Sequence, residues 1–387
     1  MIGSRWFGWI RDAILIIGII IALDAVVSLF IPAEILYGGS KDPDVYDRSV
    51  PYTHDLLPNL GPVQRYWGRS QYPFQTDRFA LRTGKCAPTD PAAVKDRSVF
   101  VSGDSMTEGL GLPYEKTMVG LMACAWRTKG LAVWNLGVTS YSPAIYWRKI
   151  KTVAAKTGIH PKENFIFLDM SDASDDAEVY QEMPDGSVVD RAPDLIAGAF
   201  QLAPHVAHPP PSWLRSAAYQ SYEFLRRNSM IVGFLGQLRD RILIWSSSSS
   251  GGRLGLRRDS WPTNKALLDA YGRRGLEINA VNLDKIVQMC RDWNCKVTLI
   301  VYPLPDQIAA HDRDSIQVRY WRDWCAKHDV RFIDGFEPFF HEPADVVLKK
   351  YFIPGDVHYN EAGHSLLFDK VYQAVWGKPS LTTSMAK

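Results

Sequence analysis

The sequence lacks an excess of charge of either sign. Its 387 residues include 44 Lys and Arg against 42 Asp and Glu, whereas proteins that bind nucleic acids usually present a strongly basic surface. A nucleic-acid partner is therefore not expected. No internal repeat with a period of about 20–50 residues is visible, so the chain is not built from repeated units. With 46% hydrophobic and 22% charged residues, it is a globular chain with room for one large domain or two smaller ones.

The sequence also lacks any cysteine spacing that is typical of a metal site. Its five cysteines form no Cys-x-x-Cys pair and lie far from any His-x3-5-His spacing, so neither a structural zinc site nor another metal is expected. Their odd number leaves at least one thiol free. Cys290 and Cys295 could pair in an oxidising compartment, with Cys325 as a competing partner, but buried thiols are the expected state.

One long hydrophobic run is present near the N-terminus. Residues 13–31, AILIIGIIIALDAVVSLFI, contain a single charge, Asp24. As a helix this run would be about 28 Å long, which is close to the thickness of a bilayer's hydrocarbon core. Arg5 and Arg11 precede it and acidic residues follow it, so the positive-inside rule places the N-terminus in the cytoplasm.

Residues 1–36 are therefore predicted to form a single-pass anchor in the cell inner membrane, with the rest of the chain on the periplasmic side. A cleaved signal peptide and a buried helix are the alternatives.

After the anchor, two regions differ in their periodicity. Residues 37–97 are rich in Pro, Asp and aromatic residues and are expected to form an irregular strap packed on the following domain. Residues 98–379 alternate β-rich runs with helical stretches, the strands being expected at SVFVSG, LAVWNLG, NFIFLDM, KVTLIVY and VRFID. This alternation predicts an α/β fold, a flavodoxin-like three-layer α/β/α arrangement with a parallel sheet whose ligands gather at the carboxyl ends of the strands.

An insertion at about 180–261 interrupts the alternation. It contains two loop-like segments, PHVAHPPPSW and WSSSSSGGRLG. Between them, apolar residues recur at helical spacing, namely Leu214, Ala218, Tyr222 and Leu225. This pattern indicates either an amphipathic helix packed on the sheet or a lid that lies on the membrane or on an anionic glycan.

A serine follows the first predicted strand. Residues 103–109 read GDSMTEG, so Ser105 lies just past a strand, between glycines that allow a tight turn. This segment resembles the nucleophile block of the SGNH/GDSL hydrolases. The resemblance extends over residues 99–375, and YPFQT and FALR at 72–82 are similar to segments of membrane-anchored bacterial members.

Further blocks of that family follow in the same order. The resemblance implies that the N–H of Gly137, within NLGV after the second strand, contributes to an oxyanion hole. Residues 355–364, GDVHYNEAGH, are similar to the block that carries the acid and the base. An Asp two residues before a His suits a loop in which Asp356 orients His358 as the base for Ser105.

The block after the third strand departs from the family pattern. The family has G-x-N-D there, with an Asn that donates to the oxyanion, whereas this chain reads LDMSDASDD and Asp172 stands at the Asn position. An ionised carboxylate cannot donate, so Asp172 would have to keep its proton to complete the hole. The acids of this segment are expected to be a solvated loop end rather than a Ca²⁺ site, because the spacing lacks the Gly and terminal Glu of an EF-hand.

Two more segments have candidate residues. His364 is expected to lie on a helix face and not to be a second base, because His358 already has the triad spacing. Tyr302 begins a Tyr-Pro-Leu-Pro segment that either shapes a pocket wall or makes a structural turn.

These features together predict a membrane-anchored, periplasm-facing serine esterase or O-acyltransferase without a cofactor. It would act on O-acetyl groups of a cell-envelope or exported glycan, or on a small ester. The alternative is a catalytically silent carbohydrate-binding or assembly subunit that partners a membrane acyltransferase.

Overall fold

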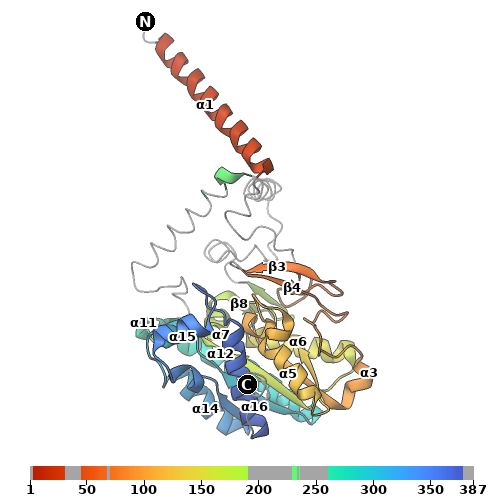
Figure 1. Cartoon of the computed structure of the whole chain (residues 1–387). Coiled ribbons are helices and arrows are strands. Elements are labelled where there is room, and N and C mark those ends of the chain that lie inside the picture. The colour runs from red at the N-terminus through yellow and green to blue at the C-terminus, as the bar shows by residue number, and fades with distance from the viewer. Residues whose placement is uncertain are drawn as a thin grey trace. The chain divides into compact units, whose positions relative to one another are not determined.

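The structure is a computed structural model, and it describes residues 3–30, 45–67, 70–190, 229–232, 235 and 260–377 (Figure 1). The chain divides into two compact units. The first comprises residues 1–42 and 208–249, and the second comprises residues 43–207 and 250–387. The candidate site lies in the second unit.

The first unit contains the N-terminal helix α1 (Gly3–Phe30), which includes the described part of the hydrophobic run. Within the described ranges, no helix is both long enough and apolar enough to cross a membrane, so the predicted transmembrane span is not supported. Asp24 accepts a hydrogen bond from the backbone N–H of Ile231 (3.0 Å). The charge within the run thus has a backbone donor in the same unit.

The second unit is built around a parallel sheet of five strands in the order β11-β10-β7-β5-β6. These strands are β5 (Ser98–Ser102), β6 (Ala132–Asn135), β7 (Glu163–Leu168), β10 (Lys296–Val301) and β11 (Arg331–Asp334). The three central strands, β5, β7 and β10, are buried along nearly their whole length, which is typical of a sheet covered on both faces. The predicted parallel α/β sheet is confirmed, and the order has the flavodoxin-like switch point between β5 and β7.

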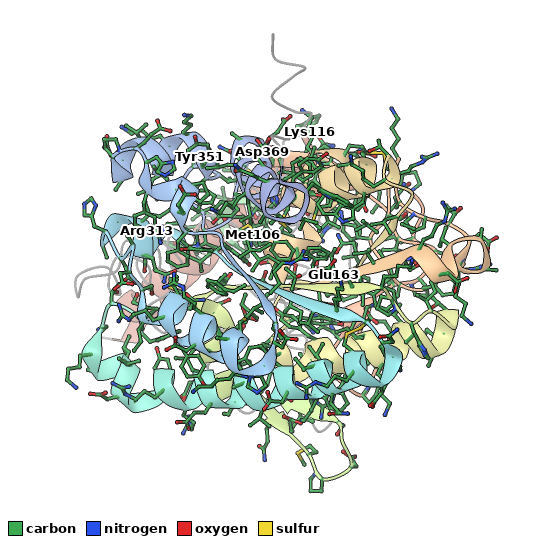
Figure 2. The ribbon with its side chains drawn as sticks, turned by 90° about the horizontal axis from the view of Figure 1, so that it is seen from below. Met106, Lys116, Glu163, Arg313, Tyr351 and Asp369 are labelled. Carbon is green, nitrogen blue, oxygen red and sulfur yellow. A yellow bond between two sulfur atoms is a disulfide. The ribbon has the colours of Figure 1, made fainter. Side chains whose placement is uncertain are left out.

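Helices cover both faces of this sheet (Figure 2). On one face lie α6 (Pro143–Thr157), α12 (Arg273–Trp293) and α14 (Ile316–His328), and on the other lie α5 (Met118–Arg127) and α16 (Glu361–Trp376). The indole N–H of Trp324 in α14 donates to Asp284 in α12 (3.2 Å). On the opposite face, Trp126 of α5 packs edge-on against Tyr372 of α16. Three layers result.

Short helices complete the unit. A 3₁₀ turn directly precedes α5, and the side chain of Thr117 caps the N-terminus of α5. The short elements are α3 (Pro91–Val94), η1 (Lys95–Arg97), α4 (Ser105–Glu108), η2 (Tyr114–Lys116), α7 (Met170–Ser174), η3 (Asp175–Val179), α11 (Lys265–Leu267), η4 (Leu268–Gly272), α13 (Pro305–Ala309), η5 (Glu337–Phe340) and α15 (Ala344–Tyr351).

The described part of the strap, residues 45–67 and 70–97, is more regular than expected. It contains two antiparallel pairs, β1 (Tyr46–Asp47) with β2 (Asp55–Leu56) and β3 (Val63–Trp67) with β4 (Ser70–Phe74). Strands of two to five residues are too short to leave a clear alternation in the sequence. The buried Lys149 of α6 forms an ion pair with Asp55 of the strap. This ion pair joins the strap to α6.

Most of the predicted insertion lies outside the described residues. Its described parts are the antiparallel pair β8 (Tyr180–Glu182) and β9 (Val188–Asp190), residues 229–232 and 235, and its C-terminal end. The buried Trp261 donates its indole N–H to the carbonyl of Met170 (2.7 Å). The helical pattern at 214–225 and both loop-like segments fall outside the described ranges.

The expectation of buried thiols is wrong for Cys290 and Cys295 and correct for Cys325, and no pairing was expected for Cys86 and Cys124. Cys86 pairs with Cys124 and Cys290 pairs with Cys295, whereas Cys325 is free and buried. Cys86 and Cys124 are 38 residues apart, and only the packing of the strap on α5 brings their Cα atoms to 5.0 Å. Cys290 and Cys295 meet because Asn294 ends α12 in a left-handed conformation that turns the chain back.

Candidate active site

Ser105 begins the short helix α4 immediately after β5. Asp104 caps this helix by accepting a hydrogen bond from the N–H of Met106 (3.0 Å). A Cβ atom on Gly103 would lie 2.0 Å from Thr107 Oγ1, so glycine is required where the strand turns into the helix. The serine is thereby held at the carboxyl edge of the sheet, beside the switch point between β5 and β7.

The structure brings the three predicted triad residues into one hydrogen-bonded chain. Nε2 of His358 lies 2.8 Å from Oγ of Ser105, and Nδ1 of His358 lies 2.5 Å from Oδ1 of Asp356. The same Oδ1 accepts the backbone N–H of His358 (2.9 Å). The loop between α15 and α16 supplies both residues, and His358 lies 253 positions after the serine.

Asp356 is suited to remain ionised. Burial by itself raises the pKa of its carboxyl, but the hydrogen bonds and the charge from His358, together with a hydrogen bond from Trp67, outweigh burial and lower that pKa. Oδ2 of Asp356 accepts the indole N–H of Trp67 (2.9 Å). The strap therefore contributes a residue to the site that the sequence motifs did not indicate, because Trp67 lies outside them, five residues before the YPFQT segment.

Gly137 lies close to the backbone of α4, the helix that begins with Ser105. A Cβ atom at Gly137 would be 2.6 Å from the backbone N of Glu108. The N–H of Gly137, the expected oxyanion donor, donates to Oδ1 of Asn135 (2.9 Å), and the amide of Asn135 donates to the carbonyl of Thr107 (3.0 Å).

Asp172 is buried, and the protein's own donors engage both of its oxygens. Oδ1 accepts the hydroxyl of Tyr146 (2.6 Å), and Oδ2 accepts the N–H of Asp169 (2.8 Å) in the capping box of α7. Burial, followed by the charges of Asp169 and Asp104, raises the pKa of Asp172 well above its usual value. Within the described residues, none of its hydrogen bonds joins it to Ser105 or His358.

The acids after the third strand are buried, so the expected solvated loop end is wrong. Asp169, Asp172, Asp175 and Asp176 are all at most 4% exposed. They fold inward because α6 and α12 supply donors to the segment, including the amide of Asn279, which donates to Asp176 (2.7 Å). Within the described ranges, no group of three or more His, Cys, Asp or Glu side chains is arranged to hold a metal ion.

Tyr302 joins two of the strand ends at the site. Its hydroxyl lies 3.1 Å from Oδ1 of Asp104 and 3.1 Å from Oδ2 of Asp169. A hydroxyl donates only one hydrogen bond, so one of the two carboxyl groups must supply the other proton. Burial, followed by the charge of Asp169, raises the pKa of Asp104 well above its usual value. Tyr302 therefore makes a structural contact at this edge.

His364 lies in α16, and it is buried away from the triad's hydrogen bonds. Its Nδ1 accepts the N–H of Met118 (3.1 Å). Burial, with the charges of Arg82 and His358, lowers the pKa of His364 to about 3, so it is neutral at physiological pH. The site therefore presents one hydroxyl nucleophile, one imidazole base and one orienting carboxylate, a combination suited to acyl transfer.

In comparisons with known proteins, the sequence matches neither a protein-family model nor a curated protein. Solved structures that resemble the chain include esterases, a GDSL-like lipase and a protein described as a putative acylhydrolase. The psychrotrophic esterase EstA from Pseudoalteromonas sp. is 11% identical with a TM-score of 0.38, and the match covers 76% of this chain and 100% of EstA.

Two further matches have similar values. A variant of Axe2, an acetyl xylan esterase from Geobacillus stearothermophilus, is 13% identical with a TM-score of 0.39, and the match covers 74% of this chain and 98% of Axe2. A GDSL-like lipase from Bacteroides thetaiotaomicron is 11% identical with a TM-score of 0.37, and the match covers 74% of this chain and 93% of the lipase.

Proposed function

We propose that this chain is a serine esterase or O-acyltransferase of the SGNH/GDSL type. The hydrogen-bonded chain from Ser105 through His358 to Asp356 is the observation that carries this proposal. Oγ of Ser105 attacks the ester carbonyl while Nε2 of His358 takes its proton, and Asp356 stabilises the imidazolium that forms. His358 then returns the proton to the leaving alcohol, which leaves an acyl group on Ser105.

The acyl group is next transferred to an incoming hydroxyl. His358 removes the proton of a water molecule or of a sugar hydroxyl, whose oxygen attacks the acyl carbon, and Ser105 recovers its proton. Water gives hydrolysis and a sugar gives O-acyl transfer. We propose the N–H groups of Ser105 and Gly137 as oxyanion donors, with Asp172 contributing in its protonated form. For Gly137 this role requires its N–H to exchange Asn135 for the oxyanion.

The proposed substrate is an O-acetylated glycan of the cell envelope or an exported glycan. This choice depends on location, because a periplasmic enzyme meets such polymers. The two disulfides support an oxidising compartment. We further propose attachment to the inner membrane through α1, which carries exposed apolar side chains at Leu15, Ile16, Ile19, Ile20, Ile21, Leu23, Val26, Val27, Leu29 and Phe30.

A second candidate function is supported by a specific observation. Both predicted oxyanion groups already have partners, since Gly137 donates to Asn135 and Asp172 accepts from Tyr146 and Asp169. A site that cannot release these groups would bind a glycan without cleaving it. The chain would then be a carbohydrate-binding or assembly subunit that partners a membrane acyltransferase.

Hydrolysis of an aryl acetate and of an acetylated oligosaccharide, by wild type and by Ser105→Ala, distinguishes the two functions. The enzyme proposal predicts release of acetate by wild type and a loss of roughly 10³-fold or more in the variant. Glycan binding without release of acetate, equal in both proteins, would favour the subunit. If a reporter that functions only in the cytoplasm is active when it is fused after Lys387, that result would contradict the proposed location.

A further inference from the structure

The strap reaches the catalytic loop through the last residue of β3. Trp67 precedes the serine block at 103–109 by more than thirty residues, yet its indole N–H donates to the carboxylate that holds the base. We propose that Trp67 is a positioning residue, which fixes Asp356 and His358 in the geometry that activates Ser105. This inference rests on the proposed function and adds a fourth member to its hydrogen-bonded chain.

Two contacts carry the inference. The indole N–H donates to Oδ2 of Asp356 at 2.9 Å, while Oδ1 accepts both N–H groups of His358. Each carboxylate oxygen therefore has its own donors on a different element, so the plane of the carboxylate cannot rotate without breaking a hydrogen bond. The Trp67 ring also meets the imidazole edge-on, with the ring centroids 5.1 Å apart and the planes at 86°. The same side chain thus restrains the carboxylate and the base.

The strap that carries Trp67 is itself fixed to the serine helix. Arg65, two residues earlier on β3, forms a salt bridge of 2.9 Å with Glu108 in α4, and both side chains are at most 4% exposed. The other carboxylate oxygen of Glu108 accepts the N–H and the hydroxyl of Thr139. The strap therefore holds the helix that begins with Ser105 and, through Trp67, the loop that supplies His358.

Arg82 strengthens the same attachment. Its buried guanidinium donates to the carbonyls of Glu108, Gly109 and Leu112 at the end of α4. The strap thus contacts both the helix that carries the nucleophile and the loop that carries the base. Removing only the indole N–H of Trp67 leaves this attachment intact, so its contribution to the triad can be tested separately.

The expected effect follows from the charge that develops during the reaction. Asp356 stabilises the imidazolium of His358 only while it stays ionised and in plane, and a hydrogen bond to a charged group is worth about 10-fold or more. Trp67→Phe should therefore lower kcat about 10-fold while KM stays within about 2-fold. It should also move the acidic limb of the pH–rate profile to higher pH, because the pKa of Asp356 rises when one of its donors is lost.

The test compares full-length wild type, Trp67→Phe and Tyr66→Phe. Tyr66 precedes Trp67 on β3, so its side chain points to the opposite face of the hairpin, where its hydroxyl accepts from Gln71. Tyr66→Phe should keep wild-type kinetics. Trp67→His, which retains a ring N–H, should recover part of the loss. In an Asp356→Ala background, Trp67→Phe should have no further effect, since its donor acts only through that carboxylate.

A spectroscopic arm makes the test independent of turnover. The low-field proton NMR signal of the His358–Asp356 hydrogen bond, assigned by its loss in Asp356→Ala, should shift or broaden in Trp67→Phe and stay in place in Tyr66→Phe. An unchanged signal, or a loss of rate equally large in the Asp356→Ala background, would overturn the role of Trp67. If wild type releases no acetate from any ester, the proposed function fails, and the NMR comparison still decides whether Trp67 positions the pair.

Discussion

Replacing Asp176 by Asn should stabilise the protein at neutral pH and leave its stability near pH 4 almost unchanged. Asp176 is buried behind the site, where it accepts hydrogen bonds from Ser142, from the N–H of Ala144 (3.2 Å) and from the amide of Asn279 (2.7 Å). Burial raises the pKa of Asp176 to about 7 even though these donors lower it. At pH 4 the side chain is a neutral acid in the folded state, which Asn resembles in shape and polarity.

The size and sign of the effect follow from the shift in pKa. Between about pH 4 and pH 7 the folded chain keeps a proton that the unfolded chain has released, so the free energy of unfolding falls by about 1.4 kcal/mol per pH unit. For a pKa that rises from 3.8 to about 7, the stability lost over this interval is about 4 kcal/mol. Asn does not titrate. The advantage of the variant should therefore grow from near zero at pH 4 to about 4 kcal/mol at pH 7.

Thermal unfolding of both full-length proteins from pH 4 to pH 8 measures this difference. For a domain of this size, about 4 kcal/mol corresponds to roughly 8 °C in Tm. Asp185→Asn is the matched control, because Asp185 is exposed and hydrogen bonds from Ser187 lower its pKa, so its removal should not raise Tm at neutral pH. A Tm difference for Asp176→Asn that stays constant or shrinks between pH 4 and pH 7 would refute the account of the buried acids.

Three further predictions concern the site. Asp172→Asn should preserve or raise turnover near pH 7 and should reduce the loss of rate at rising pH. Burial and neighbouring charges raise the pKa of Asp172, whereas the amide of Asn donates at every pH. A large loss of turnover across the pH–rate profile would instead assign the carboxylate an acceptor role. His358→Ala should lower kcat/KM for an aryl acetate by roughly 10³-fold or more, and Asp356→Asn by somewhat less; full activity in the former would transfer the base role to another residue. Glu108→Gln removes the carboxylate that faces the buried Arg65 and should cost about 3 kcal/mol in urea unfolding; wild-type stability would contradict the proposed attachment of the strap.

The sheet and the three triad residues could be predicted because their signals are local. Each strand is a short apolar run bounded by turn residues, and the alternation with helices specifies a parallel sheet. Ser105 follows the end of β5, whereas Asp356 and His358 lie in the loop between α15 and α16 and were indicated by the resemblance of residues 355–364 to the block that carries the acid and the base. The sequence therefore predicted which side chains meet, and the structure places them within hydrogen-bonding distance.

The features that escaped prediction depend on partners distant in the sequence. The run DASDD suggests solvated charges, and its burial follows only from donors on α6 and α12, such as Tyr146 and Asn279. Trp67 lies outside the segments that resemble the family, and its partner Asp356 is 289 residues away. The pairing of Cys86 with Cys124 likewise requires the strap to be placed on α5. Local periodicity contains no information about such contacts.

The proposed nucleophile can be tested most directly by labelling the protein with a serine-reactive fluorophosphonate and mapping the modified peptide by mass spectrometry. Our account predicts one label per chain, located on Ser105, with greatly slowed labelling in His358→Ala and none in Ser105→Ala, while all three proteins melt at similar temperatures. No label on wild type, or equal labelling of Ser105→Ala, would contradict the assignment of Ser105 as the nucleophile.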